Sequence, residues 1–218
     1  RRTVPQKTIS KQISLSGVGL HTGKHVNITF KPAPADTGLV FVRDDVDGDN
    51  LINAHIKYIS NNDRGTNLDN GLFRIHTSEH VLAAITGLDI DNCFICLDGP
   101  EVPIMDGSSK FFINALEQAK IVEQNVLREE FFPSEPISYL CEDTGSKISI
   151  LPDDNYRVNT IVDYKTRVLG EQEASINHIS EFKKEISSAR TFSFLHELET
   201  LLENGLIKGG DLNNAIVY

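Results

Sequence analysis

The chain has 218 residues, of which 39% are hydrophobic and 24% are charged, and this composition is typical of a folded protein rather than a disordered one. Its 31 acidic and 21 basic residues give a net charge of −10, which argues against a nucleic-acid-binding protein because such proteins need a basic surface. No signal peptide is visible and no apolar run approaches the ~18 residues of a membrane span, so we expect a cytoplasmic protein without stable membrane insertion.

The first part of the chain predicts several strands. Residues Lys7–Leu15 and His25–Phe30 alternate apolar and polar side chains, as half-buried strands do, and Leu39–Arg43 predicts another strand. Between the first two lies Ser16–Gly23, whose three glycines predict a tight turn or a backbone that another group approaches closely. A short strand follows at Phe73–His76.

Two helices are predicted in the same part of the chain. Thr77 has the side chain of an N-cap, and the helix that it opens covers residues 78–86 and closes at Gly87. A buried strand is predicted at Asp91–Leu97. The apolar residues of Lys110–Lys120 have helical spacing and predict the second helix.

The pattern then restarts. Three further strands are predicted, at Glu135–Leu140, Lys147–Leu151 and Val158–Tyr164. A helix is predicted to begin at Ser188 or Thr191 and to end near Glu203. Because both parts run from strands to a polar residue that opens a helix, we predict an α+β fold of two similar two-layer domains, each with an antiparallel or mixed sheet packed against helices. The first domain is expected at residues 1–125 and the second, incomplete, at residues 126–218.

The segment His76–His80 contains the strongest candidates for catalytic and metal-binding residues. It reads H-x-x-E-H, the zinc motif of inverzincin metallopeptidases, which requires both histidines on one face of a helix. Since His76 is predicted to end a strand outside the helix, a metallopeptidase is an alternative rather than the main prediction. Glu79 and His80 remain candidates without it, because a carboxylate in the first turn of a helix stays ionised and can act as a general base beside a metal-bound water. The alternative is an ordinary solvated first turn.

Several ordered blocks of the chain, together with these residues, resemble the UDP-3-O-acyl-N-acetylglucosamine deacetylases of lipid A biosynthesis. The resemblance covers nearly the whole chain from about Lys7 onward. The blocks are Gly17–Gly23, Pro32–Gly38, Thr77–His80 followed by Ala83 and Ala84, Ile90–Asn92, Gly99–Ser108, Ser188–Phe192 and Gly209–Val217.

The resemblance implies a zinc-dependent deacetylase that hydrolyses the acetamide of a UDP-linked, acylated amino sugar. It implies that His80 is a zinc ligand, that Glu79 is the general base for the zinc-bound water, and that the Thr191 hydroxyl stabilises the oxyanion. It also implies that Phe192 contacts the substrate and that His21 lies near the sugar or the zinc. From the residues alone, Lys208 before two glycines is a candidate for a substrate phosphate.

The family normally has a small residue where His76 stands, so we expect His76 to be a local variation rather than a ligand. Asp106 matches a family aspartate near the site, but in an Asp-Gly-Ser sequence it is equally suited to bracing a turn. The family's other zinc ligands lie in an H-x-x-x-D helix beyond the position of Tyr218, so we expect the 218-residue piece alone to bind zinc weakly and to be inactive. Iron(II) would also suit a His, His and Asp ligand set. A non-catalytic binding module is the second alternative.

Overall fold

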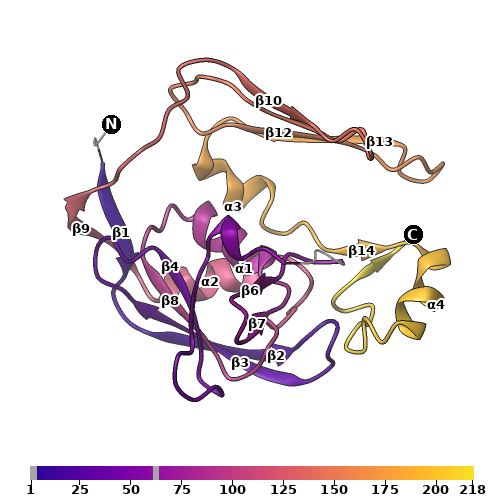
Figure 1. Ribbon diagram of the computed structural model, residues 1–218, viewed down its shortest axis with the longest axis horizontal. Coiled ribbons are helices and arrows are strands. Elements are labelled where there is room, and N and C mark those ends of the chain that lie inside the picture. The colour runs from indigo at the N-terminus through magenta and orange to yellow at the C-terminus, as the bar shows by residue number, and fades with distance from the viewer. Residues whose placement is uncertain (1–3, 61–63) are drawn as a thin grey trace.

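The computed structural model describes residues 4–60 and 64–218 and has an α+β fold (Figure 1), as predicted. Its largest element is a mixed sheet in which β8 runs parallel to β4 and every other neighbouring pair is antiparallel. The order of its strands is β2 (Ile13–Val18), β3 (His25–Pro32), β8 (Cys93–Leu97), β4 (Leu39–Arg43) and β5 (Leu51–Asn53).

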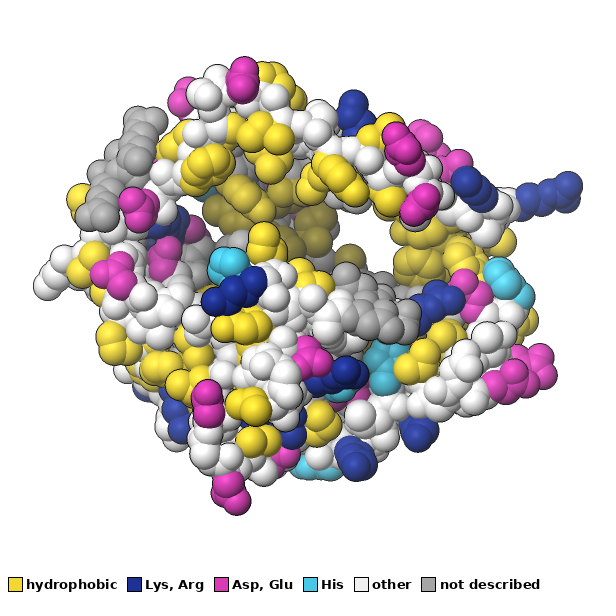
Figure 2. Space-filling model, in the orientation of Figure 1, with side chains coloured by type: hydrophobic (Ala, Val, Ile, Leu, Met, Phe, Trp, Pro, Cys, Tyr) yellow, Lys and Arg dark blue, Asp and Glu magenta, His cyan; other side chains and the backbone are white. Residues whose placement is uncertain are grey.

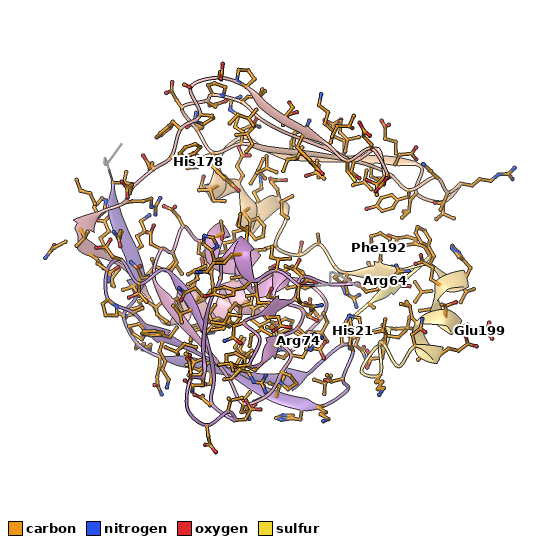
Figure 3. All side chains as sticks on the ribbon, viewed as in Figure 1. His21, Arg64, Arg74, His178, Phe192 and Glu199 are labelled. Atoms are coloured by element: carbon orange, nitrogen blue, oxygen red, sulfur yellow. The ribbon has the colours of Figure 1, made fainter. Side chains whose placement is uncertain are left out.

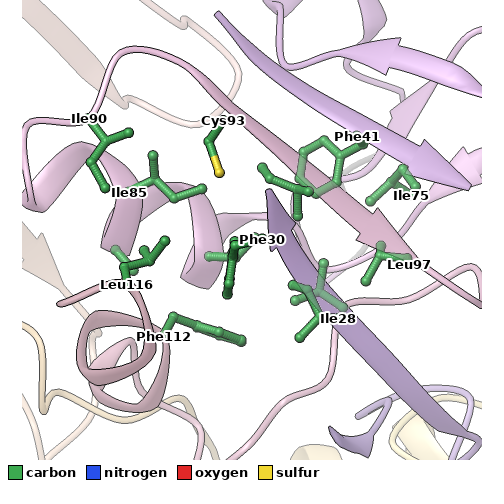
Figure 4. Packing of buried hydrophobic residues seen from close by; sticks show 14 of the residues in the cluster. Ile28, Phe30, Phe41, Ile75, Ile85, Ile90, Cys93, Leu97, Phe112 and Leu116 are labelled. Carbon is green, nitrogen blue, oxygen red and sulfur yellow. The ribbon is translucent and has the colours of Figure 1, made fainter. Parts of the chain in front are cut away.

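Two helices, α1 (Glu79–Gly87) and α2 (Lys110–Gln118), pack on one face of this sheet and enclose the main hydrophobic core (Figure 4). The alternation in β3 turns Phe30 toward the helices, where its ring meets the ring of Phe112 edge-on at a centroid distance of 6.2 Å. Both rings are fully buried, and each such side chain stabilises the fold by about 1.5–3 kcal/mol. This core holds α1, and therefore its first turn, in a fixed place on the sheet.

Short elements complete this part of the molecule. They are β1 (Pro5–Ile9), which pairs with β9 (Ile121–Leu127), the 3-10 turn η1 (Ile56–Tyr58), and β6 (Leu68–Asp69), which pairs with β7 (Arg74–Ile75). The pairing of β1 with β9 brings together segments more than 110 residues apart, and sequence analysis predicted no strand at β9.

Two hairpins form an arch over the helices (Figure 1). They are β10 (Ile137–Leu140) with β11 (Lys147–Ile150), and β12 (Val158–Asp163) with β13 (Glu171–Ile176), and the chain returns through η2 (Ile179–Glu181) and α3 (Phe182–Glu185). A cavity of about 410 Å³ lies between the arch and α1, lined by apolar side chains that include Leu82, Val158 and Ile176. Figure 2 shows hydrophobic side chains lining the hollow beneath the arch.

The last segment carries β14 (Phe192–Ser193), α4 (Leu195–Glu203) and β15 (Ile216–Val217). The two strands pair in parallel, so that residues 192–193 and 216–217 lie side by side. None of the helices in the described part of the chain is both long and apolar enough to cross a membrane.

Three local predictions were wrong. The strand expected at Lys7–Leu15 is two strands in different sheets, because Ser10 turns away to bond the carbonyl oxygens of Ala119 and Lys120. The N-cap expected at Thr77 is at Ser78, since Thr77 has a φ of +57° outside the helix. The helix expected from Ser188 or Thr191 begins only at Leu195, because the chain first forms β14.

Candidate functional site

The first turn of α1 brings the carboxylate of Glu79 beside the imidazole of His80. Glu79 Oε2 accepts a hydrogen bond of 2.9 Å from the amide of Thr66, which holds one oxygen in place. The other oxygen, Oε1, lies 3.8 Å from His80 Nε2. Gly65 lies beside this oxygen, and a Cβ atom there would be in ordinary van der Waals contact with Oε1 at 3.4 Å. Within residues 4–60 and 64–218, no hydrogen bond to Oε1 is found, so this part of the chain leaves the oxygen available to a water molecule next to the imidazole.

His80 is partly buried, with 18% of its side chain exposed. Burial lowers the pKa of His80 below its ordinary value of 6.5, although the negative charges of Glu79 and Asp106 act in the opposite direction. The hydroxyl of Ser109, just before α2, donates to the backbone carbonyl of His80. His80 is therefore a neutral imidazole at pH 7 on a firmly held backbone, and a neutral imidazole is the form that ligates metals.

The Asp106–Ser108 turn links this pair to Thr191. Asp106 Oδ1 accepts hydrogen bonds from both the amide and the hydroxyl of Ser108, so Asp106 does brace the turn. Gly107, at a φ of +87°, presents its carbonyl oxygen to the amide of Thr191 at 2.8 Å. The turn that bears Asp106, whose charge acts on His80, thus also holds Thr191. Among the described residues, no group forms a hydrogen bond with the Thr191 hydroxyl.

His21 lies in the glycine-rich turn that sequence analysis identified (Figure 3). The close approach predicted for this turn is present, because a side chain on Gly209 would collide with the carbonyl oxygen of Gly19. His21 Nδ1 accepts a hydrogen bond from the amide of Ile207 at 3.2 Å, so Nε2 carries the proton and donates toward the carbonyl oxygen of Arg64 at 3.4 Å. Both ring nitrogens have protein partners, which makes His21 a poor metal ligand in this arrangement.

Lys208 lies next to His21. Its amide donates to the carbonyl oxygen of His21 at 3.2 Å, while its side chain is exposed. The structure therefore places the backbones of two of the three residues that were predicted to bind substrate side by side, and it leaves the side chain of Lys208 exposed.

Phe192 belongs to a group of aromatic side chains between β14 and the arch. Its ring contacts those of Tyr164, Phe194 and Tyr218 edge-on, at centroid distances of 5.3, 5.7 and 5.7 Å. His196 stacks on Phe194 at 5.5 Å. Since Phe192 follows Thr191 directly, the site has a hydroxyl and an apolar surface next to each other.

The H-x-x-E-H reading is wrong. His76 precedes α1 and forms a β-bridge with Glu101, so it does not share a helical face with His80. Burial lowers the pKa of His76, and the nearby charge of Glu101 raises it by less. Among residues 4–60 and 64–218, no three His, Cys, Asp or Glu side chains are grouped closely enough to hold a metal ion. Among the described residues, His80 is therefore a single potential zinc ligand, and a complete ligand set is not present.

Two residues at this site had no predicted role. Arg190 donates from Nε to the carbonyl oxygen of Asp106 at 2.6 Å and from its terminal nitrogen to that of Leu212 at 3.0 Å, which joins two loops. Glu101 is buried between the turn of His21 and the start of α1. Neither has a local sequence signal, because its partners lie far away in the chain.

Comparison with known proteins relates the whole chain to one family. A family model described as LpxC: UDP-3-O-acyl N-acetylglycosamine deacetylase matches residues 6–218. A bifunctional enzyme LpxC/FabZ of Chlorobaculum tepidum is 45% identical over 215 residues, which are 98% of this chain and 46% of that protein. The UDP-3-O-acyl-N-acetylglucosamine deacetylases of Idiomarina loihiensis and Acidithiobacillus ferrooxidans are 40% and 38% identical, and each alignment covers 98% of this chain and 71% of the relative. The chain thus spans less than half the length of the bifunctional relatives.

Proposed function

This chain belongs to the UDP-3-O-acyl N-acetylglycosamine deacetylase family, and from that premise we propose that it carries part of the active site of a zinc-dependent, cytoplasmic deacetylase. The reaction is hydrolysis of the acetamide of UDP-3-O-acyl-N-acetylglucosamine, in lipid A biosynthesis. The observation that carries the proposal is the pair formed by Glu79 and His80, 3.8 Å apart at the start of α1 and linked through one turn to Thr191.

Glu79 is the general base of this proposal. Its Oε2 atom is held by the Thr66 amide, and its Oε1 atom, which has no hydrogen-bond donor in the described part of the chain, is the oxygen that accepts a proton from water. Hydrolysis of an amide at neutral pH needs such a base, because water itself is a weak nucleophile. The same carboxyl group then returns the proton as the tetrahedral intermediate breaks down.

Thr191 supplies the second element, a hydroxyl donor for the oxygen on which negative charge develops. A donor of this kind accelerates the reaction only if it is already positioned before the charge appears. The hydrogen bond from the Thr191 amide to Gly107 supports that condition, since it fixes the backbone that carries the hydroxyl.

Three residues bind the substrate in this proposal. The exposed ammonium of Lys208 and the neighbouring His21 suit the anionic diphosphate and the sugar. Phe192 offers an apolar surface beside the reacting group.

Zinc is part of the proposal, with His80 as one ligand and the remaining ligands outside the described residues. When bound, the metal would lower the pKa of its water and polarise the acetamide carbonyl. Of the residues in this chain, His80 would hold the metal through its imidazole, and Glu79 would take the proton of the attacking water through Oε1.

The test is acetate release from UDP-3-O-acyl-N-acetylglucosamine by the full-length gene product. The protein is stripped of metal with a chelator and then restored with zinc or iron(II). We expect activity to disappear on stripping and to return with one of these metals. A protein that releases no acetate in any of these conditions, while still binding the sugar nucleotide, would show that the site is not a deacetylase site.

That last outcome corresponds to the second candidate, a non-catalytic module that binds the sugar nucleotide. This candidate would be favoured if the full-length gene product lacked the family's H-x-x-x-D helix. The two candidates separate cleanly, because the module predicts sugar-nucleotide binding that neither zinc nor the chelator changes.

A further inference from the structure

Glu101 is a buried carboxylate at the junction of two segments that carry the site. Only 1% of its surface is exposed. Its Oε1 atom accepts hydrogen bonds from the amide of His21 at 2.9 Å and from the hydroxyl of Thr77 at 3.1 Å. Its Oε2 atom accepts a hydrogen bond from the amide of Thr22 at 2.9 Å. One side chain therefore holds both the turn that carries His21 and the residue two positions before Glu79.

The turn is built around this carboxylate. A Cβ atom at Gly19 would collide with Glu101 Oε2 and with the hydroxyl of Thr22, so only glycine lets the turn close on it. Backbone hydrogen bonds also fix the chain on the other side of Glu101. The amide of His76 donates to the carbonyl oxygen of Pro100, and the amide of Val102 donates to the carbonyl oxygen of His76. These bonds place Thr77 opposite Glu101.

Thr77 has a conformation that few side chains adopt without compensation. Its φ is +57°, in the left-handed region, and its side chain is buried, with 2% of its surface exposed. The hydroxyl that donates to Glu101 and the amide that donates to Asn67 Oδ1 hold it there. Since the next residue but one is Glu79, this conformation sets the direction in which α1 begins.

The buried carboxylate of Glu101 has no cationic partner in the described part of the chain. Among the described residues, no lysine or arginine forms an ion pair with Glu101, so its charge is compensated by donors from the backbone and a hydroxyl. Burying a carboxylate in this way is costly for the fold, and an apolar residue would fill the space at lower cost.

We propose that Glu101 is a positioning residue that fixes the turn of His21 and the start of α1 to each other, so that the substrate-binding and catalytic groups share one geometry. This inference rests on the proposed function for its kinetic consequences. It assigns two roles to one carboxylate, because the contacts with the amides of His21 and Thr22 affect substrate binding and the contact with Thr77 affects the placement of Glu79.

The test compares kcat and KM of the full-length protein in three variants. Glu101→Gln replaces one acceptor oxygen by an NH₂ group, which must face a donor on one side. We expect it to raise KM and lower kcat, with a total loss in kcat/KM of about 10- to 100-fold. Thr77→Val removes only the hydroxyl contact, and we expect a loss in kcat of about five- to tenfold with little change in KM. Thr77→Ser keeps the hydroxyl and should have a kcat close to that of the wild-type protein.

A matched control separates positioning from plain stability. Thr8 is also a buried threonine, with its hydroxyl donating to the carbonyl of Asn92 and accepting from the amide of Ala33, within β1 and away from the site. We expect Thr8→Val to lower the melting temperature about as much as Thr77→Val does, while kcat and KM stay at the wild-type values.

The outcomes distinguish this inference from the proposed function. If the wild-type protein releases no acetate, the proposed function fails. Hydrogen exchange still tests the contact itself, because the amide that faces the new NH₂ group in Glu101→Gln, of Thr22 or of His21, must exchange faster. If the wild type is active but Glu101→Gln and Thr77→Val resemble Thr8→Val, with lower melting temperatures and unchanged kcat and KM, the positioning role is overturned. Should Glu101→Gln fail to fold, the kcat values of Thr77→Val and Thr77→Ser test the positioning role instead. A kcat that is equally close to wild type in both variants would overturn it.

Discussion

Glu79 Oε1 and His80 Nε2 lie 3.8 Å apart although the two residues are neighbours in the chain. Consecutive residues on a helix point about 100° apart, so such a pair meets only where other contacts turn the side chains toward each other. Here the Thr66 amide holds Glu79, and the half-buried setting of His80 directs its ring. The first turn of α1 is therefore arranged as a base next to a potential metal ligand.

Thr191→Val is predicted to lower kcat about 10²- to 10³-fold, because it removes the donor to the developing oxyanion and keeps the shape of the side chain. The fold should be preserved, since the amide of Thr191 and its bond to Gly107 remain. Thr191→Ser serves as the control and should retain most of the activity. Steady-state acetate release checks both variants, and a Thr191→Val protein as active as wild type would remove Thr191 from the mechanism.

His80→Ala should weaken zinc binding by the full-length protein on the order of 100-fold, because His80 is the metal ligand proposed among the described residues. Titration calorimetry measures the affinity. His178→Ala, which changes an exposed histidine on the arch side of the molecule, should leave the affinity unchanged. Zinc binding that is as tight in His80→Ala as in the wild-type protein would contradict the assignment of His80 as a ligand.

A cluster of charges remote from the site predicts how stability responds to acid. Arg128 donates to both carboxylate oxygens of Asp91 at 2.6 and 2.8 Å and to Asp89 at 2.7 Å, and Lys7 also pairs with Asp89. Burial raises the pKa of Asp89, but the hydrogen bonds from Arg128 and Lys7 outweigh burial, so the pKa lies below its ordinary value of 3.8.

Because the folded protein lowers this pKa, the cluster stabilises the fold fully above about pH 4 and loses that contribution as the pH falls through the depressed pKa of Asp89. We predict that Arg128→Met lowers the free energy of unfolding by about 2 kcal/mol at pH 7 and by less in strong acid. Urea unfolding at a series of pH values measures the difference. A difference that is the same at every pH would refute the electrostatic explanation.

Gly107→Ala should destabilise the connection between the Asp106 turn and the end of the chain. Gly107 has a φ of +87°, and a Cβ atom there would collide with the carbonyl oxygen of Asn214. We expect a loss of about 2 kcal/mol or more in the free energy of unfolding. Gly48→Ala is the matched control, because Gly48 has a similar φ of +81° with no atom within 4 Å of the added Cβ, and should cost about 1 kcal/mol. Equal losses in the two variants would show that the Asn214 contact is unimportant.

The fold could be predicted where its elements depend on neighbours in the chain. Leu39–Arg43 forms β4 over the predicted bounds, and the helical spacing after Lys110 marks α2. β9 and β14 were missed because each depends on a distant partner: Ile121–Leu127 pairs with β1, and Phe192–Ser193 pairs with residues 216–217. A two-residue strand has too little pattern of its own to be recognised.

The candidate site divides in the same way. Glu79 and His80 could be found from sequence because both lie in one helical turn and in one recognisable block. Glu101 could not, because its donors lie 80, 79 and 24 residues away and its burial follows from the complete fold. The prediction that His76 lies outside the helix is confirmed, since the backbone turns at Thr77 and α1 begins only at Glu79.

The most direct test of the account is the kcat of Glu79→Gln in the full-length protein acting on UDP-3-O-acyl-N-acetylglucosamine. Glutamine keeps the size of the side chain and an oxygen for the Thr66 amide, but it cannot take a proton. We predict that kcat falls about 10²- to 10⁴-fold while KM changes little. Glu123→Gln, on the exposed side of β9, should remain fully active. A Glu79→Gln protein that releases acetate at the wild-type rate would contradict the central claim that this carboxylate is the base.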